Sequence, residues 1–254
     1  MSPLEAVALA LAAFGAGAVN AVAGGGSLIS FPSLVAVGYT AKVANVTNTV
    51  SLLPGYLGGS LAYRAELSRQ GRNLRLAFAP TLVGAIAGAV ILLSTPESTF
   101  DTIVPFLILG ACLLLAAQDR LTLILTPGAH AAVEPSLLRA VVLQLGLFGA
   151  AVYGAYFGAG LGIIILAVLG VLLPDDLHRS NALKGLLSLF INCLAAGYFA
   201  LFADVVWSAA AVMALAALGG GYLGVAVARR FPREWLRRFV IAYGVVAALV
   251  LLVT

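Results

Sequence analysis

The chain has 254 residues, of which 62% are hydrophobic and 9% are charged, and its formal net charge is +4. A typical soluble domain carries about 25% charged residues, and no soluble fold of this size could bury so much apolar surface. The composition therefore excludes a cytosolic enzyme, a nucleic-acid-binding protein and a disulfide scaffold. It predicts an all-helical protein that crosses the lipid bilayer several times.

Ten apolar segments, five in each half of the chain, are expected to form membrane helices. A helix needs about 20 residues to cross the hydrocarbon core, and the second segment of each half is too short to cross comfortably. The predicted segments of the first half are 3–23, 27–37, 43–63, 76–93 and 100–117. Those of the second half are 137–157, 161–173, 182–202, 205–228 and 236–253.

The two halves of the sequence resemble each other. Gly24 aligns with Gly158 in one register, and after a shift of two residues Asn45 aligns with Asn181. An ordered series of such matches indicates an internal repeat. We therefore predict a first repeat over 1–118, a cytoplasmic linker over 119–136 and a second repeat over 137–254.

The basic residues predict that the two repeats are inverted relative to each other. In the first half they gather after the third segment, whereas in the second half they gather after the fourth segment. Short loops rich in Lys and Arg stay on the cytoplasmic side, so equivalent loops face opposite sides. If every segment crosses, both termini lie outside and only Lys42 is misplaced. A re-entrant pair in each half would leave this argument intact, because the number of crossings stays odd.

Glycine-rich breaks precede both short segments. The first break and its flanks contribute Asn20, Gly24, Gly25, Gly26 and Ser27, and the second contributes Gly158 and Gly160. We expect Ser27 to be the N-cap of the short helix that follows it. Free N–H groups at the starts of two such helices, directed toward the middle of the protein, would form an anion-binding arrangement. Close packing of neighbouring helices is the alternative explanation of these glycines.

The third segment of each half carries polar side chains that recur at helical spacing. In the second half they are Asn181, Lys184, Ser188 and Asn192, and in the first half they are Asn45, Thr47, Asn48 and Ser51. Polar side chains on an apolar helix face a cavity, so we predict that these two faces meet at a substrate site near the bilayer midplane. Lys184 would complement a small anion there, unless it extends to the cytoplasmic interface instead.

The sequence predicts neither an enzyme nor a metal or cofactor site. All ten acidic residues lie in loops or at segment ends, which disfavours a cation substrate and a proton relay through a buried carboxylate. His130 and His178 lack the spacing of metal ligands. Ser27 has no base on a facing segment, as an intramembrane nucleophile would require.

The order of these motifs resembles the sulfite exporter TauE/SafE family, also called TSUP. The likeness covers essentially the whole chain and includes the segments 20–29, 44–49, 180–184 and 205–207. It implies a permease of the bacterial inner membrane for small anions such as sulfite, sulfonates or sulfoacetate, and we expect it to work by alternating access. An anion channel of the same topology and a membrane subunit that binds a partner without moving solute are the alternatives. The sequence leaves the oligomeric state open, and a homodimer is one of the alternatives.

Overall fold

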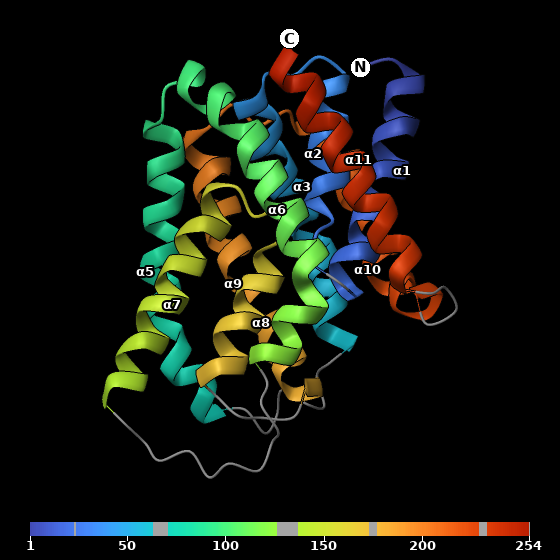
Figure 1. Cartoon of the computed structure of the whole chain (residues 1–254). Helices are drawn as coiled ribbons and strands as arrows, with labels where there is room; N and C mark the ends of the chain where they lie inside the picture. Colours follow the sequence, from blue (N-terminus) through green and yellow to red (C-terminus); the bar gives the residue numbers. More distant parts are fainter. Residues whose placement is uncertain (23, 63–70, 126–136, 173–176, 229–232, 254) are drawn as a thin grey trace.

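The computed structural model describes residues 1–22, 24–62, 71–125, 137–172, 177–228 and 233–253. Within these ranges the chain forms ten α-helices and no strand (Figure 1). The first half contains α1 (Pro3–Val22), α2 (Ser27–Ala36), α3 (Ala41–Ala62), α5 (Gly71–Ser94) and α6 (Glu97–Leu125). The second half contains α7 (Leu137–Tyr156), α8 (Leu161–Leu172), α9 (Leu177–Phe202), α10 (Trp207–Ala228) and α11 (Arg233–Val253).

The lengths of these helices confirm the predicted all-α membrane fold. Five helices, α1, α5, α6, α9 and α11, are long and apolar enough to cross a membrane. Helices α2 and α8 have 10 and 12 residues. At about 1.5 Å per residue, neither can cross a hydrocarbon core of about 30 Å. The two short segments that the sequence predicts are therefore real and too short to span.

Each short helix folds back along the helix that precedes it. A Cβ atom on Gly154 of α7 would lie 2.7 Å from the Leu161 side chain of α8, and one on Gly146 would lie 3.0 Å from Val168. Residue numbers thus rise along α8 as they fall along α7, so the pair is an antiparallel hairpin. Helices α1 and α2 also pack together, with Gly26 against the Ala16 carbonyl. Each half has three further helices, which are α3, α5 and α6 in the first half and α9, α10 and α11 in the second.

Helices of the two halves pack in matching pairs. The first helix of each half packs on the fourth helix of the other, since α1 lies against α10 and α7 lies against α5 (Figure 1). The third helices, α3 and α9, contact each other, and so do the last helices, α6 and α11. Two repeats related by an internal twofold axis would pack in this way. The pairing supports the predicted repeat, whose inverted orientation in a membrane stays a prediction.

The described charged side chains divide between the two ends of the helical bundle. The chain begins and ends at the upper end in Figure 1. That end carries the acidic residues Glu5, Glu97, Asp101 and Asp204. The opposite end, where α5 and α11 begin, carries Arg75, Arg120 and Arg238, together with Glu234, whose carboxylate lies 3.8 Å from the Arg238 guanidinium. The loop arginines Arg64, Arg69, Arg229 and Arg230 lie outside the described residues.

Lys42 is held at the acidic end by backbone groups. Its ammonium donates hydrogen bonds to the carbonyls of Leu93 at 2.9 Å and Thr95 at 2.7 Å. Leu93 lies in the last turn of α5 and Thr95 directly follows the helix, where unpaired C=O groups and the helix dipole favour a cation. The one basic residue that does not fit the predicted charge distribution therefore has a structural role, because it joins α3 to the end of α5.

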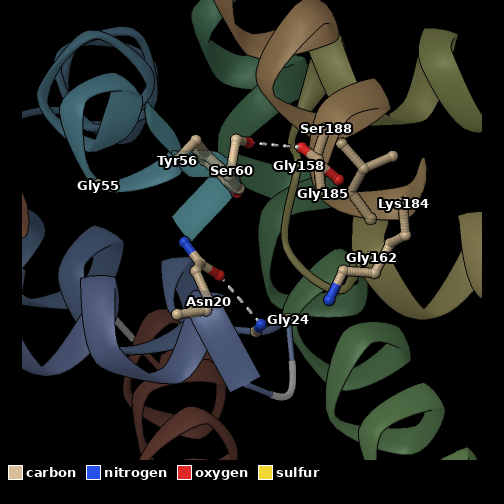
Figure 2. A pocket seen from close by; sticks show the side chains of 13 residues that line it. Asn20, Gly24, Gly55, Tyr56, Ser60, Gly158, Gly162, Lys184, Gly185 and Ser188 are labelled. Atoms are coloured by element: carbon tan, nitrogen blue, oxygen red, sulfur yellow. Dashed lines mark hydrogen bonds between the residues drawn. The ribbon is translucent and has the colours of Figure 1, made fainter. Parts of the chain in front are cut away.

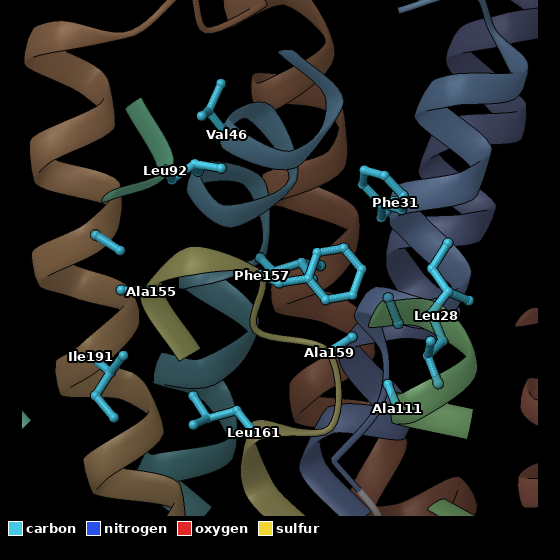
Figure 3. Close-up of a cluster of buried hydrophobic side chains, with 14 of the residues drawn as sticks. Leu28, Phe31, Val46, Leu92, Ala111, Ala155, Phe157, Ala159, Leu161 and Ile191 are labelled. Atoms are coloured by element: carbon cyan, nitrogen blue, oxygen red, sulfur yellow. The ribbon is translucent and has the colours of Figure 1, made fainter. Parts of the chain in front are cut away.

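An apolar core surrounds the hairpin turns, and a second apolar surface faces outward. Phe31 of α2 and Phe157 at the end of α7 pack edge to face with ring centroids 5.5 Å apart (Figure 3). Leu28 and Leu161, from the first turns of the two short helices, are fully buried in the same cluster. Large apolar side chains such as Leu4 and Leu113 are instead exposed on the outside of the bundle, as expected for contact with lipid.

Candidate functional site

The turns of the two hairpins meet in the interior of the protein. A Cβ atom on Gly24 would lie 3.3 Å from the Cα atom of Gly162, so the two backbones touch. Gly24, Gly158 and Gly160 have φ angles of +72°, +79° and +76°. Side chains other than glycine rarely adopt this left-handed region, which explains three of the predicted glycine positions. Helices α2 and α8 therefore begin beside each other, as the sequence predicts.

Asn20 satisfies the backbone at the start of α2. Its Oδ1 atom accepts hydrogen bonds from the N–H groups of Gly25 at 3.1 Å and Gly26 at 2.7 Å. The predicted role of Ser27 as N-cap is wrong, because Gly26 occupies that position and Ser27 is the first helical residue. Asn20 of the preceding helix takes the capping role that the sequence predicts for Ser27. The N–H groups of Gly25 and Gly26, which were expected to be free for an anion, are therefore already hydrogen-bonded.

This hydrogen bonding also fixes the orientation of the Asn20 amide. Both groups that face Oδ1 are donors, so the atom that faces them must be the oxygen. The Nδ2 amino group therefore points the other way, toward Tyr56 and Ser60 of α3 (Figure 2). One side chain thus closes the start of α2 and presents a hydrogen-bond donor to the space between α1, α3 and α9.

The start of α8 lacks such a side chain. The residue that aligns with Asn20 in the second repeat is Gly154, whose Cβ position is filled by the Leu161 side chain. Leu161 donates its N–H to the Gly158 carbonyl at 3.2 Å, whereas the Gly162 N–H has no hydrogen-bond partner among the described residues. The first turn of α8 therefore keeps a free donor and the positive end of its helix dipole.

Lys184 of α9 is buried beside this free donor. Its side chain is 6% exposed, and its Cδ and Cε atoms lie 3.4 Å from where a Gly162 Cβ would be. Because Gly162 has no side chain, the Lys184 side chain can extend across it. The Lys184 nitrogen points toward the turn at Gly24 (Figure 2). No described residue is its hydrogen-bond or ion-pair partner. The alternative that Lys184 extends to the cytoplasmic interface is therefore wrong.

Ser188 lies one turn further along α9. Its hydroxyl is buried and has no hydrogen-bond partner, although its carbonyl accepts a hydrogen bond of 2.8 Å from the Asn192 amide. A buried hydroxyl without a partner is uncommon in folded proteins, because burial removes it from water without replacing the lost hydrogen bonds. Ser188 is thus a second polar group that this conformation leaves unsatisfied.

These groups surround one small cavity of about 30 Å³ (Figure 2). A space of this size holds a water molecule, and at least about 10–15 Å³ is needed for one. Its lining comprises Asn20, Ala21, Gly24, Gly25, Gly55, Tyr56, Ser60, Gly158, Leu161, Gly162, Lys184, Gly185 and Ser188. Among the described lining residues Lys184 is the only charged one, and none of them carries a carboxylate. The charge and the hydrogen-bond donors of these residues suit an anion.

Seven residues of this lining are absent from the predicted site residues. They are Ala21, Gly55, Tyr56, Ser60, Leu161, Gly162 and Gly185. Tyr56 lies two turns beyond Asn48 on the same helix face, which is a usable signal. The three glycines and Ser60 give no such signal, because glycine and serine are frequent in helices that pack closely. Ser60 enters the site because it meets α9, where its hydroxyl donates to the Gly185 carbonyl at 3.4 Å.

Four predicted site residues of α3 lie away from this cavity. Asn45 donates to the Tyr156 carbonyl at 2.8 Å, and Thr47 accepts a hydrogen bond of 3.1 Å from the Val206 N–H just before α10. Ser51 donates to the Thr47 carbonyl within the same helix. Asn48 is buried, and its Oδ1 atom has no partner, as is also true of Asn45 Oδ1. The side chain of Asn181 lies outside the described residues.

The lining offers no set of metal ligands. No group of three or more His, Cys, Asp or Glu side chains comes together in the described part of the chain. Hydrogen-bond donors dominate instead, from an ammonium, an amide, a hydroxyl and a backbone N–H. Such a lining can bind an anion directly, without an intervening metal ion.

Comparisons with known proteins agree with this architecture. The profile described as "Sulfite exporter TauE/SafE" matches residues 9–251. A "Probable membrane transporter protein ORF9" of Sinorhizobium sp. is 28% identical over 88% of this chain and 81% of its own length. A "Probable membrane transporter protein" of Haemophilus influenzae is 25% identical over 90% of this chain and 87% of its own length. The "Probable membrane transporter protein YfcA" of Escherichia coli K12 is 26% identical over 91% of this chain and 81% of its own length.

No solved structure matches the chain. The profile nevertheless extends over both hairpins and the three further helices of each half, so it covers the whole architecture rather than one part of it. The relatives align along most of their own length as well. The chain therefore belongs to the TauE/SafE sulfite exporter family of membrane transporters.

Proposed function

We propose that this protein is a permease that binds a small oxyanion at the junction of the two hairpins and moves it by alternating access. The observation that carries the proposal is Lys184, a buried cation that has no partner among the described residues and lies in a cavity lined by hydrogen-bond donors. Ionisable residues inside a membrane domain are rare, and they commonly mark the path of a substrate. Sulfite, sulfonates and sulfoacetate are the substrates that membership of the family favours.

The position of the cavity suggests which access state is represented. Ser60 near the end of α3 and Lys184 near the start of α9 belong to the half of the bundle that carries Arg75 and Arg120. The rule that basic residues stay inside makes this half cytoplasmic, and both termini then lie outside the bacterial inner membrane. In the proposed cycle this inward-facing arrangement alternates with an equivalent outward-facing arrangement, in which the two repeats exchange their conformations.

The exchange gives a role to the polar residues that lie away from the cavity. In the repeat alignment Asn48 corresponds to Lys184, and Asn45 corresponds to Asn181. Their buried Oδ1 atoms lack partners in this conformation. In the outward-facing state the equivalent cavity of the other repeat would form beside Asn45 and Asn48. Their amides would then line the outer part of the substrate path, and Lys184 would line the inner part.

The proposal is tested by anion flux into liposomes that contain the purified protein. Lys184→Gln should lower the uptake of the best transported anion at least about tenfold, because a hydrogen bond to a charged group contributes about 1.5–3 kcal/mol. The matched control is Lys42→Gln, because this is the chain's other lysine and its partners are carbonyls at the outer end. Uptake that saturates with anion concentration supports a permease.

Two outcomes would contradict the proposal. Uptake that rises linearly with concentration would favour an anion channel. No uptake of any small anion, or equal uptake by the Lys184→Gln variant and the wild type, would favour a subunit that binds a partner without moving solute.

A further inference from the structure

Two residues that occupy equivalent positions in the predicted repeats meet between α3 and α9. In the register that aligns Asn45 with Asn181, Tyr56 of α3 aligns with Asn192 of α9. The hydroxyl of Tyr56 interacts with the Asn192 side chain. Residues that a twofold axis exchanges can touch only where both lie close to that axis, so this pair marks the predicted axis between the repeats.

The two helices run in opposite directions past this pair. The Ser60 hydroxyl of α3 donates to the Gly185 carbonyl of α9 at 3.4 Å. From this contact to the pair of Tyr56 and Asn192, residue numbers fall along α3 and rise along α9. The end of α3 and the start of α9 therefore lie on one side of the pair, and the start of α3 and the end of α9 lie on the other.

The two sides of the pair differ in polarity and in packing. On one side, Tyr56 lines the cavity together with Ser188, which lies one turn before Asn192. On the other side, the side chains one turn away are apolar and buried, since Leu52 is 2% exposed and Ala196 is 3% exposed. Leu52 is the repeat equivalent of Ser188. The cavity therefore lies on one side of the pair, and apolar packing begins on the other.

We propose that Tyr56 and Asn192 form the central barrier of the permease, a statement that rests on the proposed function. In this conformation the pair separates the inward-facing cavity at Lys184 from the outer part of the path at Asn48. An anion would pass between the two side chains as the repeats exchange their conformations. The Tyr56 hydroxyl and the Asn192 amide both carry hydrogen-bond donors, so the anion can replace their mutual contact while it passes.

The reactivity of cysteines on the two sides of the barrier tests this proposal. Ser188→Cys places a thiol on the cavity side, and Leu52→Cys places one at the equivalent position on the other side. Each is made in the full chain, with Cys112 and Cys193 replaced by serine, and studied in inside-out membrane vesicles. A membrane-impermeant methanethiosulfonate that carries a sulfonate group is added to the cytoplasmic face. Free cysteine inside the vesicles quenches any reagent that enters.

We expect Ser188→Cys to react and Leu52→Cys to be protected, because the reaction of a thiol requires access to it. Adding Tyr56→Ala to Leu52→Cys removes the ring from the barrier, and the protection should be lost. Adding Leu57→Ala is the matched control and should leave the protection intact, because Leu57 is 46% exposed on the outside of the bundle. If the Tyr56→Ala protein does not fold, Asn192→Ala opens the same contact from α9.

The outcomes separate the two proposals. Labelling of Leu52→Cys while Tyr56 is present, or its continued protection after the barrier is truncated, would overturn the barrier and leave the anion permease standing. Protection of Ser188→Cys would overturn the barrier as well, because the cavity would then not open to the cytoplasmic face. The permease fails separately, if the wild type takes up no small anion or the Lys184→Gln variant takes up as much as the wild type.

Discussion

At the scale of single residues, Asn20 shows how one side chain can have a structural and a binding role. Its oxygen accepts two backbone hydrogen bonds at the start of α2, and its nitrogen points toward the cavity. The two roles belong to different atoms of the same amide. They can therefore be separated by substitution, because aspartate keeps the acceptor and removes the donor.

We predict that the Asn20→Asp variant folds normally but binds and transports the anion poorly. A carboxylate oxygen can still accept from the N–H groups of Gly25 and Gly26, and a negative charge is favourable at a helix start. The second carboxylate oxygen would stand where Asn20 has its Nδ2 donor, and its negative charge would repel an anionic substrate. Thermal unfolding in detergent should change little, whereas anion uptake should fall at least about tenfold.

Asn20→Leu is the matched comparison, because it removes the acceptor as well. Two buried N–H groups would lose their partner, and we expect a loss of about 1–3 kcal/mol in the free energy of unfolding. Full transport activity in the Asn20→Asp protein would show that the Nδ2 donor has no part in binding.

At the scale of helices, contacts between the halves depend on close approach of backbones. A Cβ atom on Gly220 of α10 would collide with the Phe14 carbonyl of α1, and one on Gly84 of α5 would collide with the Phe148 carbonyl of α7. Gly84 and Gly220 are equivalent in the repeat alignment. Small residues at such interfaces let membrane helices pack closely where the lipid offers no hydrophobic driving force.

We predict that Gly220→Ala destabilises the protein and that Gly219→Ala does not. At Gly219 the nearest atoms to a new Cβ are those of the Phe14 ring at 3.8 Å, an ordinary contact. The methyl group at 220 would force α1 and α10 apart, at about 1–3 kcal/mol. Unfolding of the two purified variants in mixed micelles measures the difference. Equal stability of both would mean that α1 can shift without loss of packing.

At the scale of the whole molecule, charge and topology agree. The acidic end holds both termini, and the opposite end carries the described arginines of α5, α6 and α11. We predict that an odd number of helices crosses in each half, so that the second half starts on the side opposite to the first. This parity is the condition for inverted repeats.

We predict that Glu97→Cys is labelled from outside the cell and Arg238→Cys only from inside. Both positions are exposed, and they lie at opposite ends of the bundle. The native Cys112 and Cys193 would first be replaced by serine. A membrane-impermeant maleimide, applied to intact and then to permeabilised cells, gives the measurement. Labelling of both cysteines in intact cells would contradict the inverted arrangement.

Much of the fold could be predicted because it follows from local properties of the chain. Apolar segment lengths gave all ten helices, since the bilayer thickness sets the length of a spanning helix. The glycine breaks before α2 and α8 were predicted because left-handed backbone favours glycine, and Gly24 and Gly158 adopt it. The predictions of repeat boundaries and of substrate contacts stay untested.

The sequence by itself determined that this protein lies in a membrane, is built of ten helical segments and has two glycine turns, because composition and segment length act locally. Only the tertiary structure decided which polar residues share a cavity. It brought Ser60 and Gly162 to Lys184 and left Asn45 and Thr47 bonded to the ends of other segments. The physical reason is that a polar side chain in a helix needs some partner, and whether that partner is backbone or a substrate depends on which helix lies opposite.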